Sequence, residues 1–226
     1  MFEQLFNAFM PHRCCNCLEI GQLLCESCKY DILNEPFSGC LLCLGPCGPS
    51  GICNRCQRDS LIDQAWCAGL REGALKSFLD GYKFDCRRGG YRQIADLMEA
   101  TIPRLDLETI VLGVPSSPKA VRQRGFSHVE LFAKEFAKRR SLQYYQYLER
   151  ASSETLHFLS KQERVALGPE LFRIKDVLLP EAVLLVDDIL TTGTTMMAAC
   201  RLLKQNGVQY VYAIAIARQN MKDVWG

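Results

Sequence analysis

Beyond residue 60, two patterns of hydrophobic and polar positions alternate along the chain. Short apolar runs predict buried strands, and apolar residues three and four positions apart predict helices. The predicted strands are 62–70, 109–115, 183–186 and 208–217. The predicted helices are 74–84, 91–99, 127–139 and one that begins at Met196. Strands that alternate with helices indicate an α/β fold with a parallel sheet, which binds ligands at the carboxyl ends of its strands.

The segment 183–195 joins a predicted strand to a predicted helix and gives the strongest indication of function. Its four apolar residues are followed by Asp187 and Asp188, and a hydroxyl-rich loop then precedes the helix. The loop residues are Thr191, Thr192, Gly193, Thr194 and Thr195. Free amides at a helix N-terminus bind phosphate, and glycine allows the backbone to approach it closely. The two carboxylates would repel an anion but suit ribose hydroxyls or hydrated Mg²⁺, so the segment predicts a sugar-phosphate site.

Ten of the thirteen cysteines lie between Cys14 and Cys56. Eight of them form four Cys-x-x-Cys pairs: Cys14 and Cys17, Cys25 and Cys28, Cys40 and Cys43, Cys53 and Cys56. Each pair presents two thiolates to one ion and two pairs complete a tetrahedral site, so the sequence predicts two structural Zn²⁺ sites. Sequence order joins the first pair with the second and the third with the fourth, and an interleaved arrangement stays open. An iron–sulfur cluster is a weaker alternative, while Cys15 and Cys47 fall outside the spacing.

Composition changes after Asp59 and Ser60, so we predict a double zinc ribbon over 1–60 and an α/β domain over 61–226. The first segment has four basic and six acidic residues, a balance of −2, which weakens the case for it as a phosphate-binding surface. The whole chain has a net charge of +2 and no apolar run long enough to span a membrane. Its start does not resemble an export signal, so we expect a cytoplasmic protein.

The segment 183–195 resembles the phosphoribosyl pyrophosphate (PRPP) motif of type I phosphoribosyltransferases. Motifs for nucleoside triphosphates or dinucleotides, Gly-x-x-x-x-Gly-Lys-Ser/Thr and Gly-x-Gly-x-x-Gly, do not occur. Val114-Pro115 with the segment 122–127 resembles the Pro-x-x-x-x-Arg-Gly-Phe-Asn-Gln region of the ComF family. That family joins an N-terminal double zinc ribbon to a phosphoribosyltransferase domain. Pro11 to Cys14 and Leu79 to Phe84 are similar to its Pro-x-x-Cys and Leu-Lys-Tyr elements.

The resemblance implies binding of PRPP with Mg²⁺ and transfer of the phosphoribosyl group to an unidentified acceptor, with release of pyrophosphate. Asp187 and Asp188 are then expected to hold the ribose hydroxyls and to favour the positive charge that develops on the sugar, while the threonine loop fixes the 5′-phosphate. Arg164 lies where the family has a mobile loop and is expected to neutralise pyrophosphate; a solvated arginine is the alternative. In that loop, Leu156 and Leu167 stand where the family usually has Gln and Asn.

The resemblance also implies a role in DNA uptake during natural transformation. One alternative is a non-catalytic scaffold that senses PRPP or binds single-stranded DNA and docks onto a DNA-uptake helicase. A weaker alternative is a nucleobase salvage phosphoribosyltransferase. The basic residues expected to contact single-stranded DNA are Arg122 and Arg124, with Lys138, Arg139, Arg140, Arg87, Arg88 and Arg92. His128 and His157 have no recognisable partner in the sequence and are assigned no catalytic role.

Overall fold

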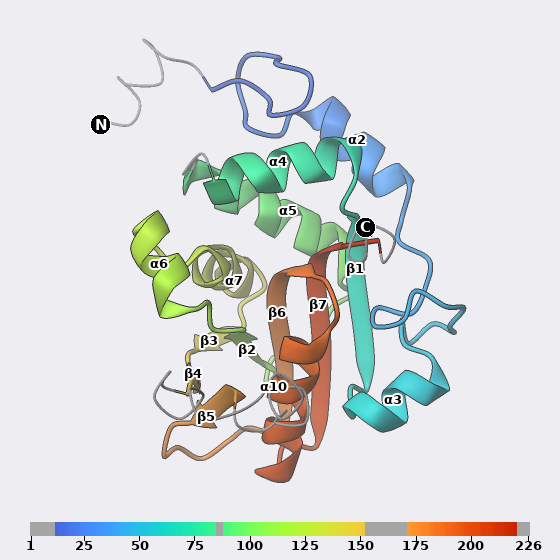
Figure 1. The fold of residues 1–226 in the computed structure, drawn as a ribbon, viewed down its shortest axis with the longest axis vertical. Helices are drawn as coiled ribbons and strands as arrows, with labels where there is room; N and C mark the ends of the chain where they lie inside the picture. The colour runs from blue at the N-terminus through green and yellow to red at the C-terminus, as the bar shows by residue number, and fades with distance from the viewer. Residues whose placement is uncertain (1–11, 85–87, 152–170, 221–226) are drawn as a thin grey trace.

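A five-stranded sheet forms the centre of the computed structural model, which describes residues 12–84, 88–151 and 171–220. All neighbouring strands pair in parallel, in the order β1-β7-β6-β2-β3. These strands are β1 (Gln64–Leu70), β2 (Ile110–Gly113), β3 (Gln143–Tyr145), β6 (Ala182–Leu190) and β7 (Tyr210–Arg218). A separate antiparallel pair consists of β4 (Leu148–Arg150) and β5 (Phe172–Ile174). The predicted α/β fold with a parallel sheet is confirmed (Figure 1).

Helices cover both faces of the sheet (Figure 1). One face packs against α2 (Glu26–Asn34), α4 (Gly73–Phe84), α5 (Tyr91–Thr101) and α7 (His128–Arg139). The other face packs against α3 (Asn54–Ser60) and α10 (Thr194–Gln205). Two further elements, the 3-10 turn η1 (Arg88–Gly90) and α6 (Pro118–Arg124), precede α5 and α7 respectively. The central strands are therefore covered on both sides, which explains their continuous apolar sequences.

Strand β6 shows how one strand supplies two hydrophobic cores. Leu184 and Val186 lie in the core beneath α4, α5 and α7, whereas Val183 and Leu185 lie in the core beneath α10. All four side chains have no solvent exposure. This division follows from the alternation of side chains along a strand, which sends successive residues to opposite faces.

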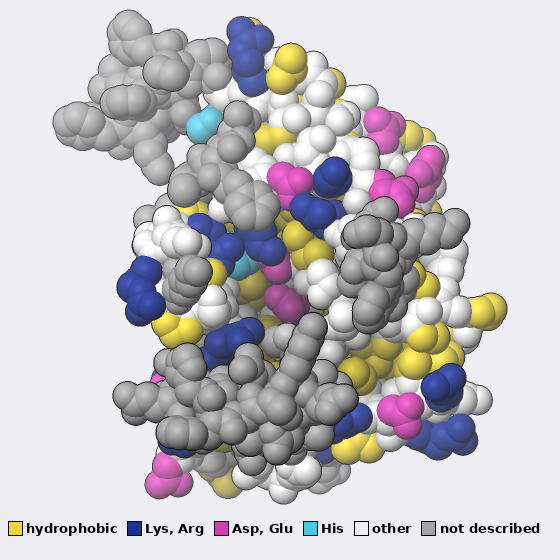
Figure 2. All heavy atoms as spheres, viewed as in Figure 1, with side chains coloured by type: hydrophobic (Ala, Val, Ile, Leu, Met, Phe, Trp, Pro, Cys, Tyr) yellow, Lys and Arg dark blue, Asp and Glu magenta, His cyan; other side chains and the backbone are white. Residues whose placement is uncertain are grey.

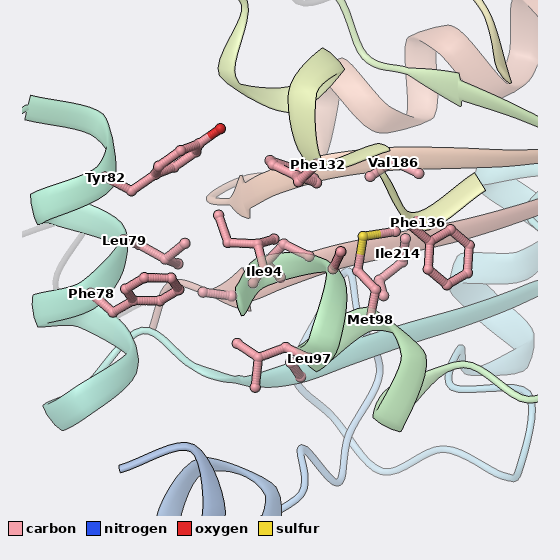
Figure 3. Packing of buried hydrophobic residues seen from close by; sticks show 14 of the residues in the cluster. Phe78, Leu79, Tyr82, Ile94, Leu97, Met98, Phe132, Phe136, Val186 and Ile214 are labelled. Atoms are coloured by element: carbon pink, nitrogen blue, oxygen red, sulfur yellow. The ribbon is translucent and has the colours of Figure 1, made fainter. Parts of the chain in front are cut away.

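Figure 3 shows the core beneath α4, α5 and α7. Its labelled side chains come from three helices and two strands: Phe78, Leu79 and Tyr82 of α4, Ile94, Leu97 and Met98 of α5, Phe132 and Phe136 of α7, Val186 of β6 and Ile214 of β7. The Tyr82 hydroxyl donates a hydrogen bond of 2.9 Å to the backbone oxygen of His128. This bond satisfies a buried hydroxyl and ties the end of α4 to the start of α7.

The cysteine-rich N-terminal segment contributes to both cores. Leu24 and Ile32 lie in the core with α4 and α5, while Leu41 and Ile52 lie in the core with α10. Residues on the two sides of the predicted boundary at residue 60 therefore pack together. The boundary itself remains a prediction.

The structure extends the sequence prediction at the functional end of the sheet. β6 continues through Asp187 and Asp188 to Leu190, because it pairs with β7 as far as the partners Leu190 and Arg218. α6 was not predicted; it begins at Pro118, where the Ser117 hydroxyl accepts a hydrogen bond of 3.2 Å from the Ala120 amide. A serine N-cap followed by proline is a frequent helix start. The three-residue strands β3, β4 and β5 are too short to show a periodic pattern.

Candidate functional site

Asp187 and Asp188 lie near the end of β6 and belong to opposite faces of the sheet, because side chains alternate along a strand. Asp188 lies on the face covered by α4 and α7. Its Oδ2 atom is 2.5 Å from Nζ of Lys83 and shares a short hydrogen bond with Nε2 of His128. His128, for which no partner was recognisable in the sequence, therefore has Asp188 as its partner in the fold. The contact was invisible in the sequence because α4, α7 and β6 come together only in the fold.

The environment of the two carboxyl groups separates their pKa values. Burial acts to raise the pKa of Asp188, but the hydrogen bond from His128 and the charge of Lys83 outweigh burial and hold this pKa below its usual value. Burial and the negative charge of Asp188 raise the pKa of Asp187 well above its usual value. Asp188 is therefore the more strongly ionised member of the pair.

Arg150, at the end of β4, lies on the side of the site that contains Asp187. Burial lowers the pKa of its guanidinium, and the negative charge of Asp187 opposes that shift. Its Nε atom donates a hydrogen bond of 3.0 Å to the backbone oxygen of Pro115, and its guanidinium carbon lies 5.6 Å from the centre of the Phe172 ring. Arg150 therefore links the loop after β2 to the carboxylate side of the site. This role of Arg150 was not predicted from the sequence.

The threonine loop leads from β6 into the first turn of α10. Gly193 is the N-cap of the helix and has a φ of 77°, a left-handed conformation that glycine adopts without strain. Thr191 and Thr192 are exposed, and the hydroxyl oxygens of Thr192 and Thr194 lie 2.9 Å apart. The first turn of α10 contains no acidic residue. The amides of this turn and the neighbouring hydroxyls therefore fit a phosphate group.

The distribution of charge around the site suits a ligand with both anionic groups and hydroxyls. In Figure 2, acidic side chains near the centre of the visible face are bordered by Lys and Arg side chains, with a His side chain beside them. Carboxylate oxygens are ligands that Mg²⁺ prefers, and the half-buried Asp187 is accessible to such an ion or to ribose hydroxyls. The carboxylates thus fit the hydroxyls of the predicted ligand, and the Lys and Arg side chains fit its anionic groups.

The eight cysteines of the Cys-x-x-Cys pairs form two groups of four. The thiol sulfurs within each group lie within 4.8 Å of one another, and the groups are Cys14, Cys17, Cys25 and Cys28, and Cys40, Cys43, Cys53 and Cys56. We call them the first and the second cysteine cluster. The first Cys-x-x-Cys pair thus joins the second, and the third joins the fourth, so the pairs are not interleaved. A tetrahedron with Zn–S bonds of about 2.3 Å places its sulfurs about 3.8 Å apart. The distances of 3.5 Å between Cys17 and Cys25 and 3.8 Å between Cys43 and Cys53 are compatible with that geometry.

The two cysteine clusters lie on opposite faces of the sheet. Cys14, Cys25 and Cys28 belong to the core with α4 and α5, whereas Cys40 belongs to the core with α10. In the second cluster, hydrogen bonds from Cys56 lower the pKa of the Cys53 thiol to about 7, which favours the thiolate form that binds metal. Each cluster therefore fits a structural Zn²⁺ ion that fixes a different side of the N-terminal segment.

Two of the basic residues predicted to contact DNA form contacts within the protein. Arg139 forms ion pairs with three acidic side chains of α5 and α7: Asp96, Glu99 and Glu135. Arg140 donates hydrogen bonds to the backbone oxygens of Glu99 and Ile102. Arg122, at the end of α6, is exposed and remains a candidate. Arg87 and the side chain of Arg88 lie outside the described residues.

Comparisons with known proteins agree with this architecture. The model of the phosphoribosyl transferase domain family matches residues 159–223, which include β6, the threonine loop and α10. Competence protein ComFC of Streptococcus pneumoniae (strain ATCC BAA-255 / R6) is 31% identical over 147 residues. These findings confirm the resemblance to the ComF family. The match covers 64% of this chain and 64% of the relative's length.

Part of the predicted site lies outside the residues that the structure describes. The segment 152–170 contains Arg164, His157 and the two leucines, Leu156 and Leu167, that depart from the ComF pattern. The predicted role of Arg164 therefore remains a prediction. Among the helices that the structure describes, none is both long and apolar enough to cross a membrane.

Proposed function

We propose that this chain binds PRPP together with Mg²⁺ and transfers the phosphoribosyl group to an acceptor, with release of pyrophosphate. One observation carries the proposal: β6 has two carboxylates near its end and leads through the threonine loop into a helix N-terminus that fits phosphate. A sugar phosphate combines a group for the helix N-terminus with hydroxyls for the carboxylates. The match to the phosphoribosyl transferase domain family covers this same unit.

The two carboxylates have different roles in this proposal. Both oxygens of Asp188 already have partners, since Oδ2 contacts Lys83 and His128, and Oδ1 accepts a hydrogen bond of 2.6 Å from the Ile189 amide. Asp188 therefore supplies negative charge beside the ribose, where positive charge develops as pyrophosphate leaves. Asp187, which is half-buried, is the carboxylate that contacts the ribose hydroxyls or the ion.

The remaining residues fix the two ends of the substrate. The threonine loop binds the 5′-phosphate and thereby orients the sugar, so positioning contributes to the rate. Arg164 neutralises pyrophosphate after the bond between the ribose carbon and the pyrophosphate oxygen breaks. When bound, Mg²⁺ supplies further positive charge for the leaving group.

The relative's name, competence protein ComFC, favours a role in DNA uptake, which we place in the cytoplasm. A non-catalytic scaffold that binds PRPP without turnover is the second candidate. Leu156 and Leu167 favour it, because they stand where the ComF pattern has the polar residues Gln and Asn in the loop expected to close over pyrophosphate. Nucleobase salvage is a weaker candidate, and the cysteine-rich segment provides no reason to prefer it.

Calorimetric titration of PRPP with Mg²⁺ into the zinc-loaded protein tests the proposal. Saturable binding is expected in the wild type and in Asp176→Asn, an exposed carboxylate after β5, and is expected to be lost in Asp187→Asn. Pyrophosphate release in the presence of candidate acceptors then separates the enzyme from the scaffold. The absence of saturable binding by the folded wild type would contradict both candidates.

A further inference from the structure

Arg218, the last residue of β7, has no solvent exposure. Its guanidinium donates hydrogen bonds of 2.5 to 2.9 Å to five backbone oxygens, those of Leu41, Leu42, Leu190, Thr191 and Gln219. Burial lowers the pKa of the Arg218 guanidinium. Removing a charged side chain from water is costly, so these carbonyl contacts are needed to hold it there.

The hydrogen bonds of Arg218 join two segments that are far apart in the sequence. Leu41 and Leu42 are the two residues between Cys40 and Cys43, the first pair of the second cysteine cluster. Leu190 and Thr191 form the junction between β6 and the threonine loop. The same guanidinium therefore binds the backbone of a cysteine pair and the backbone of the loop that fits phosphate.

Leu42 provides a second, independent contact between the same two segments. A Cβ atom placed on Gly193 would lie 2.6 Å from Cδ2 of Leu42, closer than real atoms approach. Leu42 therefore packs directly against the N-cap glycine of α10, and both residues are buried. The side chain occupies the space in which the loop backbone would otherwise move.

The second cysteine cluster is in turn attached firmly to the sheet. The backbone oxygen of Ser50 accepts a hydrogen bond of 2.7 Å from Ala65 of β1, and that of Gly51 accepts one of 3.0 Å from Leu41. A Cβ atom on Gly51 would lie 1.9 Å from the backbone oxygen of Ala65. The cysteine pair thus has a fixed position relative to the sheet, from which it can support the loop.

We propose that Arg218 and Leu42 are positioning residues that hold the threonine loop in its phosphate-binding conformation, so that the second cysteine cluster determines the shape of this loop. The loop needs such support because Thr191 and Thr192 are exposed and a phosphate binds best to amides that are already oriented. The first cysteine cluster, by contrast, belongs to the core with α4 and α5 on the opposite face of the sheet. The expected effect on PRPP affinity rests on the proposed function, whereas the effect on loop conformation is independent of it.

Hydrogen exchange of the backbone amides of residues 191–197 in the ligand-free protein measures the loop directly. Leu42→Ala is compared with Leu23→Ala, which removes another buried leucine of the N-terminal segment, from the opposite core. Both variants are expected to lose thermal stability. Only Leu42→Ala is expected to accelerate exchange of the loop amides, by about tenfold, and to weaken binding of PRPP with Mg²⁺ by about tenfold.

Arg218→Lys keeps the positive charge but has fewer donors in a different geometry. It is also expected to accelerate exchange of the loop amides and to weaken binding of PRPP with Mg²⁺. If Arg218→Lys or Leu42→Ala does not fold, Leu42→Val compared with Leu23→Val gives the test. Equal exchange in the Leu42 and Leu23 variants would overturn the inference. If the wild type does not bind PRPP, the proposed function fails, and hydrogen exchange alone decides whether Arg218 and Leu42 position the loop.

Discussion

The Nζ atom of Lys83 lies 2.5 Å from Oδ2 of Asp188, and this contact joins the end of α4 to the end of β6. The hydroxyl of Tyr82, the neighbour of Lys83, donates a hydrogen bond to the backbone oxygen of His128. The imidazole of His128 in turn contacts Asp188. The orientation of this carboxylate therefore depends on helices that cover one face of the sheet. The threonine loop, by contrast, is supported from the other face through Arg218.

The different surroundings of Asp187 and Asp188 predict opposite effects on stability. Asp187→Asn removes a charge that burial and Asp188 disfavour, so we expect it to raise the free energy of unfolding by about 1 kcal/mol. Asp188→Asn leaves the largely buried amine of Lys83 without its partner carboxylate, so we expect a decrease of about 3 kcal/mol. Urea unfolding at neutral pH measures both changes. If the free energy of unfolding changed with the same sign in the two variants, the two carboxyl groups would not have opposite environments.

The same two variants predict a characteristic dependence on pH. The raised pKa of Asp187 means that the folded protein holds a proton that the unfolded chain releases near pH 4, so ionisation of Asp187 costs stability as the pH rises. The gain in the free energy of unfolding from Asp187→Asn should therefore vanish below about pH 4 and grow as the pH rises toward the raised pKa of Asp187. The lowered pKa of Asp188 contributes stability above about pH 4 that is lost as the pH falls.

Unfolding curves between pH 3 and pH 8 test this pair of dependences, and the exposed Asp176→Asn serves as the control. The penalty of Asp188→Asn should be fully present at neutral pH and should shrink below about pH 4. A stability difference between wild type and Asp187→Asn that does not change with pH would show that Asp187 titrates normally.

The exposure of the cysteines predicts the order in which the two clusters lose zinc. Cys43 is exposed and its partners Cys53 and Cys56 are half-buried, whereas the first cluster is buried except for Cys17. We therefore expect a chelator to remove zinc in two phases, with the second cluster emptying first. A zinc indicator should show that Cys43→Ser eliminates the fast phase and that Cys17→Ser eliminates the slow one. If Cys17→Ser eliminated the fast phase instead, the first cluster would be the one that loses zinc first.

The sequence predicted those parts of the fold that depend on local patterns. The apolar run 183–186 identified a strand covered on both faces, because each of its residues enters one of two cores. The end of that strand was predicted too early, because Asp187 and Asp188 interrupt the apolar run although pairing with β7 continues. The helix α6 was missed because its start depends on a capping serine and a proline rather than on apolar periodicity.

The candidate site was predictable only where its residues are neighbours in the sequence. The two carboxylates and the threonine loop are contiguous, so the spacing alone indicated a sugar-phosphate site. Lys83, His128 and Arg218 come from three distant elements, α4, α7 and β7. Their roles depend on contacts that the sheet topology creates, and a single sequence does not contain that information.

The basic surface gives the last prediction, since two of its proposed members are engaged within the protein. Arg122 is exposed at the end of α6, so Arg122→Gln should weaken binding to single-stranded DNA and reduce the slope of log affinity against log salt concentration by about 0.7. Arg58→Gln changes an exposed arginine of α3 and should leave that slope unchanged. Arg139→Gln breaks ion pairs between α5 and α7, so it should lower thermal stability instead. Fluorescence anisotropy of a labelled oligothymidine at several salt concentrations measures the slopes, and equal slopes for wild type and Arg122→Gln would exclude the end of α6 from the DNA contact.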